Sequence, residues 1–274
     1  MVDWNDFYNR MVKFTRITTL PVGVKYFRDR ADVPKKAKVV EKNQAMCQLM
    51  AQARLLGRPV VGVPEYANSC SLGSYALGFA DLGAEFKSGK RNLGTYHKSA
   101  ENSAKFFAGV DRLEQGKYKA FLAAPITRYN EFGIDPDVVA VYGFPSQIMR
   151  YIQGWVFMGG SPIEARTYGD MACSETWVGP IVRQVPRLIL PCNGERVFCG
   201  GQDYDMAFSM PAKDVEDTLI GMEAMHEAGI RFPITSNILD ATPVPPAAYF
   251  ISPEDHPGTG GHRGLAVLKK YGRE

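Results

Sequence analysis

The chain has 274 residues, of which 45% are hydrophobic and 22% charged, an ordinary balance for a protein with a full hydrophobic core. Its 32 basic and 29 acidic residues give a net charge of +3 without a long run of either sign, which argues against nucleic acid as a partner. No stretch approaches the ~20 apolar residues of a membrane span, and acidic Asp3 and Asp6 lie where a secretory signal needs positive charge. We therefore expect a cytoplasmic protein with reduced thiols and no membrane partner.

In the first part of the chain, apolar residues recur at intervals of three and four through 4–15, which predicts an amphipathic helix. An alternating run predicts a strand over 22–27. A helix is expected from an N-cap at Asn43 to about Leu56, before Gly57 and Pro59. A short strand should cover 59–64, and small residues favour a tight helix or turn over 71–80.

The second part of the chain predicts a further alternation of helices and strands. They are a helix over 99–116, a strand over 120–125, a strand over 138–142, a helix from 146, a strand over 207–210 and a helix over 212–228. The dipeptide Asn193-Gly194 between two β-branched runs, 187–192 and 195–199, indicates a hairpin with a type I′ turn.

Two stretches read like copies of one another, each with a β-branched run, a helix, a glycine and proline break, a strand and a cysteine. They span about 20–80 and 138–180, with Cys70 matched by Cys173 and Cys47 replaced by Ser146. The predicted fold class is therefore α/β (or α+β), with two pseudo-symmetric strand-helix-strand halves packed as one globular unit over 1–228. Residues 229–274 form a proline- and glycine-rich C-terminal extension without periodicity, through which the chain could form a homo-oligomer.

Four of the five cysteines are the candidate metal ligands: Cys47, Cys70, Cys173 and Cys192. Thiolates suit an iron–sulfur cluster or tetrahedral zinc, although no Cys-x2-Cys spacing is present. Two alternatives stay open, namely buried core cysteines and thiol-based redox catalysis by Cys47 or Cys70. A disulfide between Cys192 and Cys199 conflicts with the hairpin, which separates them by ~13 Å.

Other motifs give weaker indications. The glycines of 258–264 lack the spacing of a phosphate loop, and the four histidines show no paired metal-ligand spacing. The pair Asp203 and Asp205 could do acid–base work or only solvate a strand edge.

Several motifs in order resemble those of an uncharacterised prokaryotic family, domain of unknown function 169. They are Pro21-Val22-Gly23-Val24-Lys25-Tyr26, Cys47 with its helix, Ser69-Cys70-Ser71-Leu72-Gly73, 141–149 and Pro191-Cys192-Asn193-Gly194-Glu195-Arg196. The resemblance implies anaerobic metabolism and recurring cysteines at the four candidate positions, but not at Cys199. It also implies that the extension after Gly229 is an addition to the family core.

The leading hypothesis is a cysteine-ligated metal or iron–sulfur protein, with a [4Fe–4S] cluster favoured over another thiophilic metal. Such a protein could be an enzyme that hydrates, dehydrates or oxidises a small organic acid, with Arg54 and Arg196 holding the substrate carboxylate. The alternative is a small-molecule-binding protein with structural cysteines and a ligand between the two halves. Its cleft would be lined by aromatic residues, namely Tyr66, Tyr75, Trp155 and Trp177.

Overall fold

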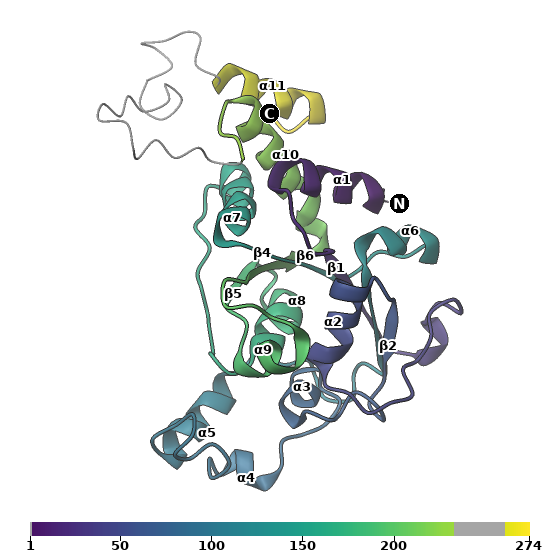
Figure 1. Ribbon diagram of the computed structural model, residues 1–274, viewed down its shortest axis with the longest axis vertical. Coiled ribbons are helices and arrows are strands. Elements are labelled where there is room, and N and C mark those ends of the chain that lie inside the picture. The colour runs from purple at the N-terminus through teal and green to yellow at the C-terminus, as the bar shows by residue number, and fades with distance from the viewer. Residues whose placement is uncertain (1, 233–260) are drawn as a thin grey trace.

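The computed structural model describes residues 2–232 and 261–274 as a mixed α/β fold around one antiparallel sheet (Figure 1). The sheet has six strands in the order β2-β3-β1-β4-β6-β5. In chain order they are β1 (Val22–Phe27), β2 (Val60–Gly62), β3 (Ala120–Pro125), β4 (Val138–Gly143), β5 (Arg187–Ile189) and β6 (Met206–Pro211). The predicted strands over 22–27, 120–125, 138–142 and 207–210 are thereby confirmed.

Both faces of the sheet are buried, because apolar residues occupy successive positions of each central strand. In β4, Val138 and Ala140 belong to one core, and Val139 and Val141 belong to the other. A strand that is buried on both faces reads as a continuous apolar run instead of an alternating one. The sheet is therefore the middle of three layers.

The first core lies under α1 (Trp4–Thr15), α7 (Pro145–Gly159) and α10 (Val215–Glu227), which Figure 1 shows together on one side of the sheet. Helix α1 buries the predicted stripe, and its N-cap Asp3 accepts hydrogen bonds from the backbone N–H groups of Asn5 and Asp6. A shorter helix, α6 (Tyr129–Phe132), packs against the same core.

The second core lies on the opposite face. It is covered by α2 (Met46–Leu56), α3 (Ser71–Ala76), a π-helical turn (Ser174–Val178) continued by α8 (Gly179–Arg183), and α9 (Asn193–Cys199). Helices α4 (Ala84–Lys87) and α5 (Ala100–Gly109) extend from this face and pack on each other through Phe86 and Phe107. Cys173 and Cys192 border this second core.

The connectivity repeats on the two sides of the β1–β4 pair. In the first half, β1 is followed by α2, the edge strand β2, α3, the additional helices α4 and α5, and then β3. In the second half, β4 is followed, after α7, by the π-helical turn with α8, the edge strand β5, α9 and then β6. Since β1 and β4 are the central antiparallel neighbours, the strand order is the same when read outward from either of them. This is a repeat of connectivity, and the symmetric packing of two halves stays a prediction.

The structure corrects the predicted correspondence between the segments of the two halves. No strand forms in 160–172, where the second copy was expected to have one, and the corresponding edge strand is β5. Helix α7, which begins with Pro145 and Ser146, lies on the face opposite α2 and is not its counterpart. The resemblance arises because Gln48 and Gln147 each accept a hydrogen bond from the backbone N–H three residues earlier, at 2.9 Å in both helices.

Two further predictions are wrong. Residues 193–199 form helix α9 and not the second strand of a hairpin, because Glu195 takes a buried position and Gly200, with φ +68°, caps the helix end. Within the predicted aperiodic extension, α11 (Gly261–Tyr271) is a helix that packs on α10 through Val267. The rest of that extension, 233–260, lies outside the described residues. None of the described helices combines the length and apolar character of a membrane-spanning segment.

Candidate functional site

The four candidate cysteines each lie at the start of a helical element on the same face of the sheet. Cys47 is the second residue of α2, Cys70 directly precedes α3, Cys173 directly precedes the π-helical turn, and Cys192 directly precedes α9. All four thiols are free and partly buried. Each side chain is therefore held where backbone N–H groups of a first helical turn are not used within the helix.

Contacts between the two halves of the fold bring these helix starts together. Helix α2 of the first half packs against α9 of the second, and α3 packs against the π-helical turn. In connectivity, Cys47 and Cys173 both begin the helical element before an edge strand, and Cys70 and Cys192 both begin the short helix after it. Each half thus contributes two cysteines at equivalent places, in a register that pairs Cys70 with Cys192 and not with Cys173.

The charges of the other three cysteines act on Cys173. Burial raises the pKa of Cys173 well above its usual value, and the negative charges of Cys47, Cys70 and Cys192 raise it further. The pKa of Cys192 is also raised, first by burial, although backbone N–H groups of Glu195 and Ala172 oppose the shift. The charge of Cys47 therefore acts on both Cys173 and Cys192.

Cys47 and Cys199 form a direct pair. A hydrogen bond from the Cys199 thiol lowers the pKa of Cys47, with help from the backbone N–H groups of Gln48 and Cys47, and raises the pKa of Cys199. Cys199 is 3% exposed, so its proton is held in the core. This contact was not predicted from the sequence, because the expected hairpin placed residue 199 in a strand and not in a helix.

Glu195 is a functional candidate that sequence reasoning missed. It is 4% exposed, and the Tyr142 hydroxyl donates to its Oε1 at 2.5 Å. Its Oε2 has no hydrogen-bond partner among the described residues. Burial raises the pKa of this carboxyl, opposed by Tyr142, Arg54 and Arg196. The charge of Glu195 acts on four of the cysteines, so the carboxyl lies near their thiols. They are Cys47, Cys173, Cys192 and Cys199. The sequence feature that could have indicated Glu195 is its position three residues after Cys192, where an acidic residue is typical of the first turn of a helix.

The two predicted carboxylate-binding arginines lie near this cluster but already have protein partners. The Arg54 guanidinium donates to the carbonyl oxygen of Cys199 at 2.8 Å and lies 4.2 Å from the centre of the Tyr142 ring, with Asp205 at 3.9 Å. Its side chain is only 3% exposed.

Arg196 serves mainly to fix the segment around α9. It donates to the carbonyl oxygens of Pro191 and Gln202 at 3.0 and 2.5 Å and lies 3.3 Å from Asp203. Its side chain is 27% exposed, so it is the more accessible of the two arginines. The acid pair is likewise divided, because Asp205 faces Arg54 whereas Asp203 pairs with Arg196.

The donor set forms no site for a single metal ion among the described residues. In 2–232 and 261–274, no group of three or more histidine, cysteine, aspartate or glutamate side chains is placed to hold one ion. A tetrahedral zinc site needs sulfurs ~3.8 Å apart, since each Zn–S bond is about 2.3 Å. The charges of Cys47, Cys70 and Cys192 act on Cys173, but the described residues do not form a site for a single ion.

The predicted aromatic cleft is divided among separate places. Tyr66, Tyr75 and Trp155 line three different cavities, and Trp177 is 1% exposed in the second core. These four side chains do not share one cleft between the halves.

Comparisons with known proteins place the chain in a family. The model of the family described as uncharacterised ArCR, DUF169, matches residues 10–220. An uncharacterized protein of Methanocaldococcus jannaschii, MJ0308, is 23% identical over 206 residues, which is 74% of this chain and 86% of that protein. No solved structure matches the chain.

Proposed function

Since the chain belongs to the uncharacterised family DUF169, whose model covers residues 10–220, we propose a function from the thiol cluster itself. Cys47, Cys70, Cys173 and Cys192 hold a thiolate-ligated polynuclear metal cluster, with [4Fe–4S] favoured. The observation that carries this proposal is that the four cysteines begin helical elements that pack together in pairs, α2 with α9 and α3 with the π-helical turn. The charges of the other three cysteines also act on Cys173. The recurrence of the same connectivity in both halves supports it.

We favour a polynuclear group over a single ion because the described residues form no single-ion site. One zinc ion requires its ligand sulfurs in mutual contact, and no such trio exists among the described residues. A cluster of several irons holds its cysteines at separate corners, so its ligand sulfurs are farther apart than around one ion. The larger group is therefore the one that we propose for these four cysteines.

The surroundings also suit a negatively charged cluster. Backbone N–H groups of Cys47 and Gln48 favour the thiolate of Cys47, and those of Glu195 and Ala172 do the same for Cys192. Such N–H donors to sulfur, together with burial, are the features that tune cluster potentials in proteins. A bound cluster would supply electron transfer or, with an open iron, Lewis-acid chemistry.

An enzymatic role rests on Glu195 beside the thiols. A buried carboxyl with a raised pKa holds its proton more readily than an exposed one and can pass it to a bound molecule. The Oε2 of Glu195 has no protein partner among the described residues. The hydroxyl of Tyr142 fixes the other oxygen. Hydration, dehydration or redox chemistry on a small organic acid therefore stays the proposed reaction class. The carboxylate-holding role of Arg54 and Arg196 stays a prediction.

The test is metal content after purification without oxygen. Iron, zinc and acid-labile sulfide are measured per chain, with the visible spectrum, for the native protein and for serine variants of the four cysteines. We expect iron with sulfide in the native protein and loss of most of it in Cys70→Ser and Cys192→Ser. Cys199→Ser is the matched control, because this cysteine lies in the same cluster but outside the proposed ligand set.

A folded native protein without metal, or Cys70→Ser and Cys192→Ser variants with full metal content, would contradict the assignment. The first result would favour the alternative, a small-molecule-binding protein in which the cysteines are structural. If Cys199→Ser lost as much metal as Cys70→Ser and Cys192→Ser, the loss would reflect general disruption of the cysteine site and not removal of a ligand.

A further inference from the structure

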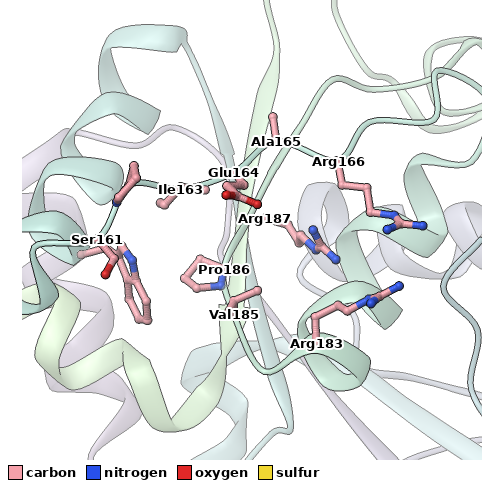
Figure 2. A pocket seen from close by; sticks show the side chains of 11 residues that line it. Ser161, Ile163, Glu164, Ala165, Arg166, Arg183, Val185, Pro186 and Arg187 are labelled. Atoms are coloured by element: carbon pink, nitrogen blue, oxygen red, sulfur yellow. The ribbon is translucent and has the colours of Figure 1, made fainter.

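A separate cavity of about 850 Å³ opens at the β5 edge of the sheet (Figure 2). Its walls come from the end of α7, the segment that follows it, the end of α8 and the first residue of β5. Cavities of this size accept small organic molecules. None of its lining residues is a cysteine, so it is distinct from the thiol cluster.

Three arginines line one side of the cavity. Figure 2 shows the guanidinium groups of Arg166, Arg183 and Arg187 gathered together, across the cavity from Ser161 and Ile163. They come from the segment after α7, from α8 and from β5, so only the folded chain brings them together. Planar guanidinium groups are the side chains that best match the oxygens of phosphate and carboxylate.

The positive charge of this wall is only partly neutralised. Asp111, 5% exposed, accepts hydrogen bonds from Arg183 Nε at 2.9 Å and from Arg187 Nη2 at 3.0 Å, so one carboxylate serves two arginines. Arg166 donates to the carbonyl oxygen of Gly109 at 2.6 Å and to the Tyr168 hydroxyl at 3.1 Å, and these partners are neutral.

No ion pair joins Arg166 to an acidic side chain in the described part of the chain. Asp111 and the exposed Glu164 of the same cavity supply two negative charges against three arginines. The buried Glu175 carboxyl also interacts with Arg187, but burial raises its pKa to about 7, so near neutral pH it supplies only part of a third negative charge. An excess of positive charge therefore remains for a bound anion.

The arginine wall is also held in place before any ligand binds. Asp111 is fixed in turn, because its backbone N–H donates to the Tyr168 hydroxyl at 3.0 Å and its carbonyl oxygen accepts from the Ser174 hydroxyl. Arg187 is only 6% exposed, so its guanidinium has little freedom. Preorganised donors bind an anion without a large ordering cost.

The rest of the cavity offers apolar contact. Trp155, Ile163, Val185 and Pro186 line it. Trp155 is partly exposed, whereas the other two tryptophans, Trp4 and Trp177, are each 1% exposed. An exposed indole in a cavity is a surface on which a planar ring stacks.

We propose that this cavity binds an organic phosphate with a planar ring, of about the size of a nucleoside monophosphate. The phosphate dianion is held by Arg166 and Arg183, with Arg187 behind them, and the ring contacts Trp155. A dianion with three oxygens matches the three gathered guanidinium groups better than a carboxylate, which one arginine satisfies with two parallel hydrogen bonds.

Tryptophan fluorescence is the direct assay, because Trp155 is the partly exposed indole of the three. Adenosine 5′-monophosphate is titrated into the native protein, with adenosine and inorganic phosphate as the probes that lack one half of the ligand. We expect saturable quenching by the nucleotide and binding of each partial probe at least about tenfold weaker. Trp155→Phe should abolish the fluorescence change while calorimetry still detects binding.

Arg166→Gln and Arg183→Gln should each weaken the nucleotide about tenfold or more, the usual scale for hydrogen bonds to a charged group. Both side chains are exposed, so the fold is retained, as circular dichroism would verify. Arg30→Gln is the matched control, since this exposed arginine pairs with Glu65 away from the cavity.

Equal affinity of the native, Arg166→Gln and Arg183→Gln proteins, or no saturable response to either the nucleotide or inorganic phosphate, would overturn the proposal. The inference does not depend on the thiol cluster. A metal-free Cys70→Ser variant should still bind the nucleotide, so failure of one proposal is distinguishable from failure of the other.

Discussion

Helices α7 and α10 cross at two glycines, and replacing one of them should destabilise the protein by a predictable amount. A Cβ atom at position 154 would lie 2.4 Å from the carbonyl oxygen of Thr218 and 2.6 Å from Cγ of Met222. A Cβ atom at Gly221 would lie 2.2 Å from the carbonyl oxygen of Gly154. Both helices are buried along this contact, so Gly154→Ala forces their backbones apart.

The expected cost follows from two opposing effects. Overpacking of a close contact costs typically 1–3 kcal/mol, and the upper end applies here because the overlap is with backbone atoms that cannot rotate away. Alanine is favoured over glycine within a helix by up to about 1 kcal/mol. The net prediction for Gly154→Ala is a loss of about 2 kcal/mol in the free energy of unfolding, which corresponds to a fall in Tm of roughly 4–8 °C.

Gly159→Ala is the matched control in the same helix. Gly159 is the last residue of α7, and a Cβ atom there meets nothing within 4 Å. This variant should therefore gain up to ~0.5 kcal/mol from helix propensity alone. Urea unfolding and calorimetry of the two variants measure the difference directly. Equal stability of Gly154→Ala and Gly159→Ala would show that α7 and α10 are not packed as closely as described.

Two further variants test the charged groups of the second core. Burial raises the pKa of Glu175 to about 7 from 4.5. The protonated carboxyl therefore contributes fully to the free energy of unfolding below pH ~4.5, and this contribution is lost as pH rises through ~7. The loss amounts to ~3 kcal/mol. Urea unfolding at pH 5 and pH 8 should show that Glu175→Gln removes this dependence, and an unchanged pH profile would refute it. Arg54→Lys should cost ~2 kcal/mol, because an ammonium group cannot donate to the Cys199 carbonyl oxygen, face Asp205 and stack on Tyr142 together. A change below ~0.5 kcal/mol in urea unfolding would mean that these contacts contribute little.

The central strands and the amphipathic helices were predictable from sequence because their signals are local. The alternating run of β1 and the short apolar runs of β3 and β4 indicate strands, and the stripe of α1 repeats at helical spacing. The family was also predictable, because several ordered motifs carry it. What these signals lack is any indication of which face of the sheet each helix covers.

The prediction of a hairpin was wrong because Asn193-Gly194 is a strong turn signal only when strands flank it. Residues 195–199 contain the β-branched and aromatic residues that favour a strand, but Glu195 is drawn into the core by the hydroxyl of Tyr142, and Gly200 provides a helix end. Tertiary contact therefore overrides the local preference. The error mattered for the site, because the helix places both Glu195 and Cys199 among the thiols.

The predicted correspondence between segments of the two halves was wrong for a related reason. The likeness between the segments at Cys47 and Ser146 reports a shared way to begin a helix, since Gln48 and Gln147 make the same capping contact. Capping residues recur wherever a helix starts, so they carry no information about ancestry or about the face of the sheet. Connectivity around the edge strands instead pairs Cys47 with Cys173, and Cys70 with Cys192. In this register every cysteine of the proposed site has a counterpart, whereas Cys199 has none. If the four cysteines act as one ligand set, Cys47→Ser and Cys173→Ser should therefore affect metal content alike.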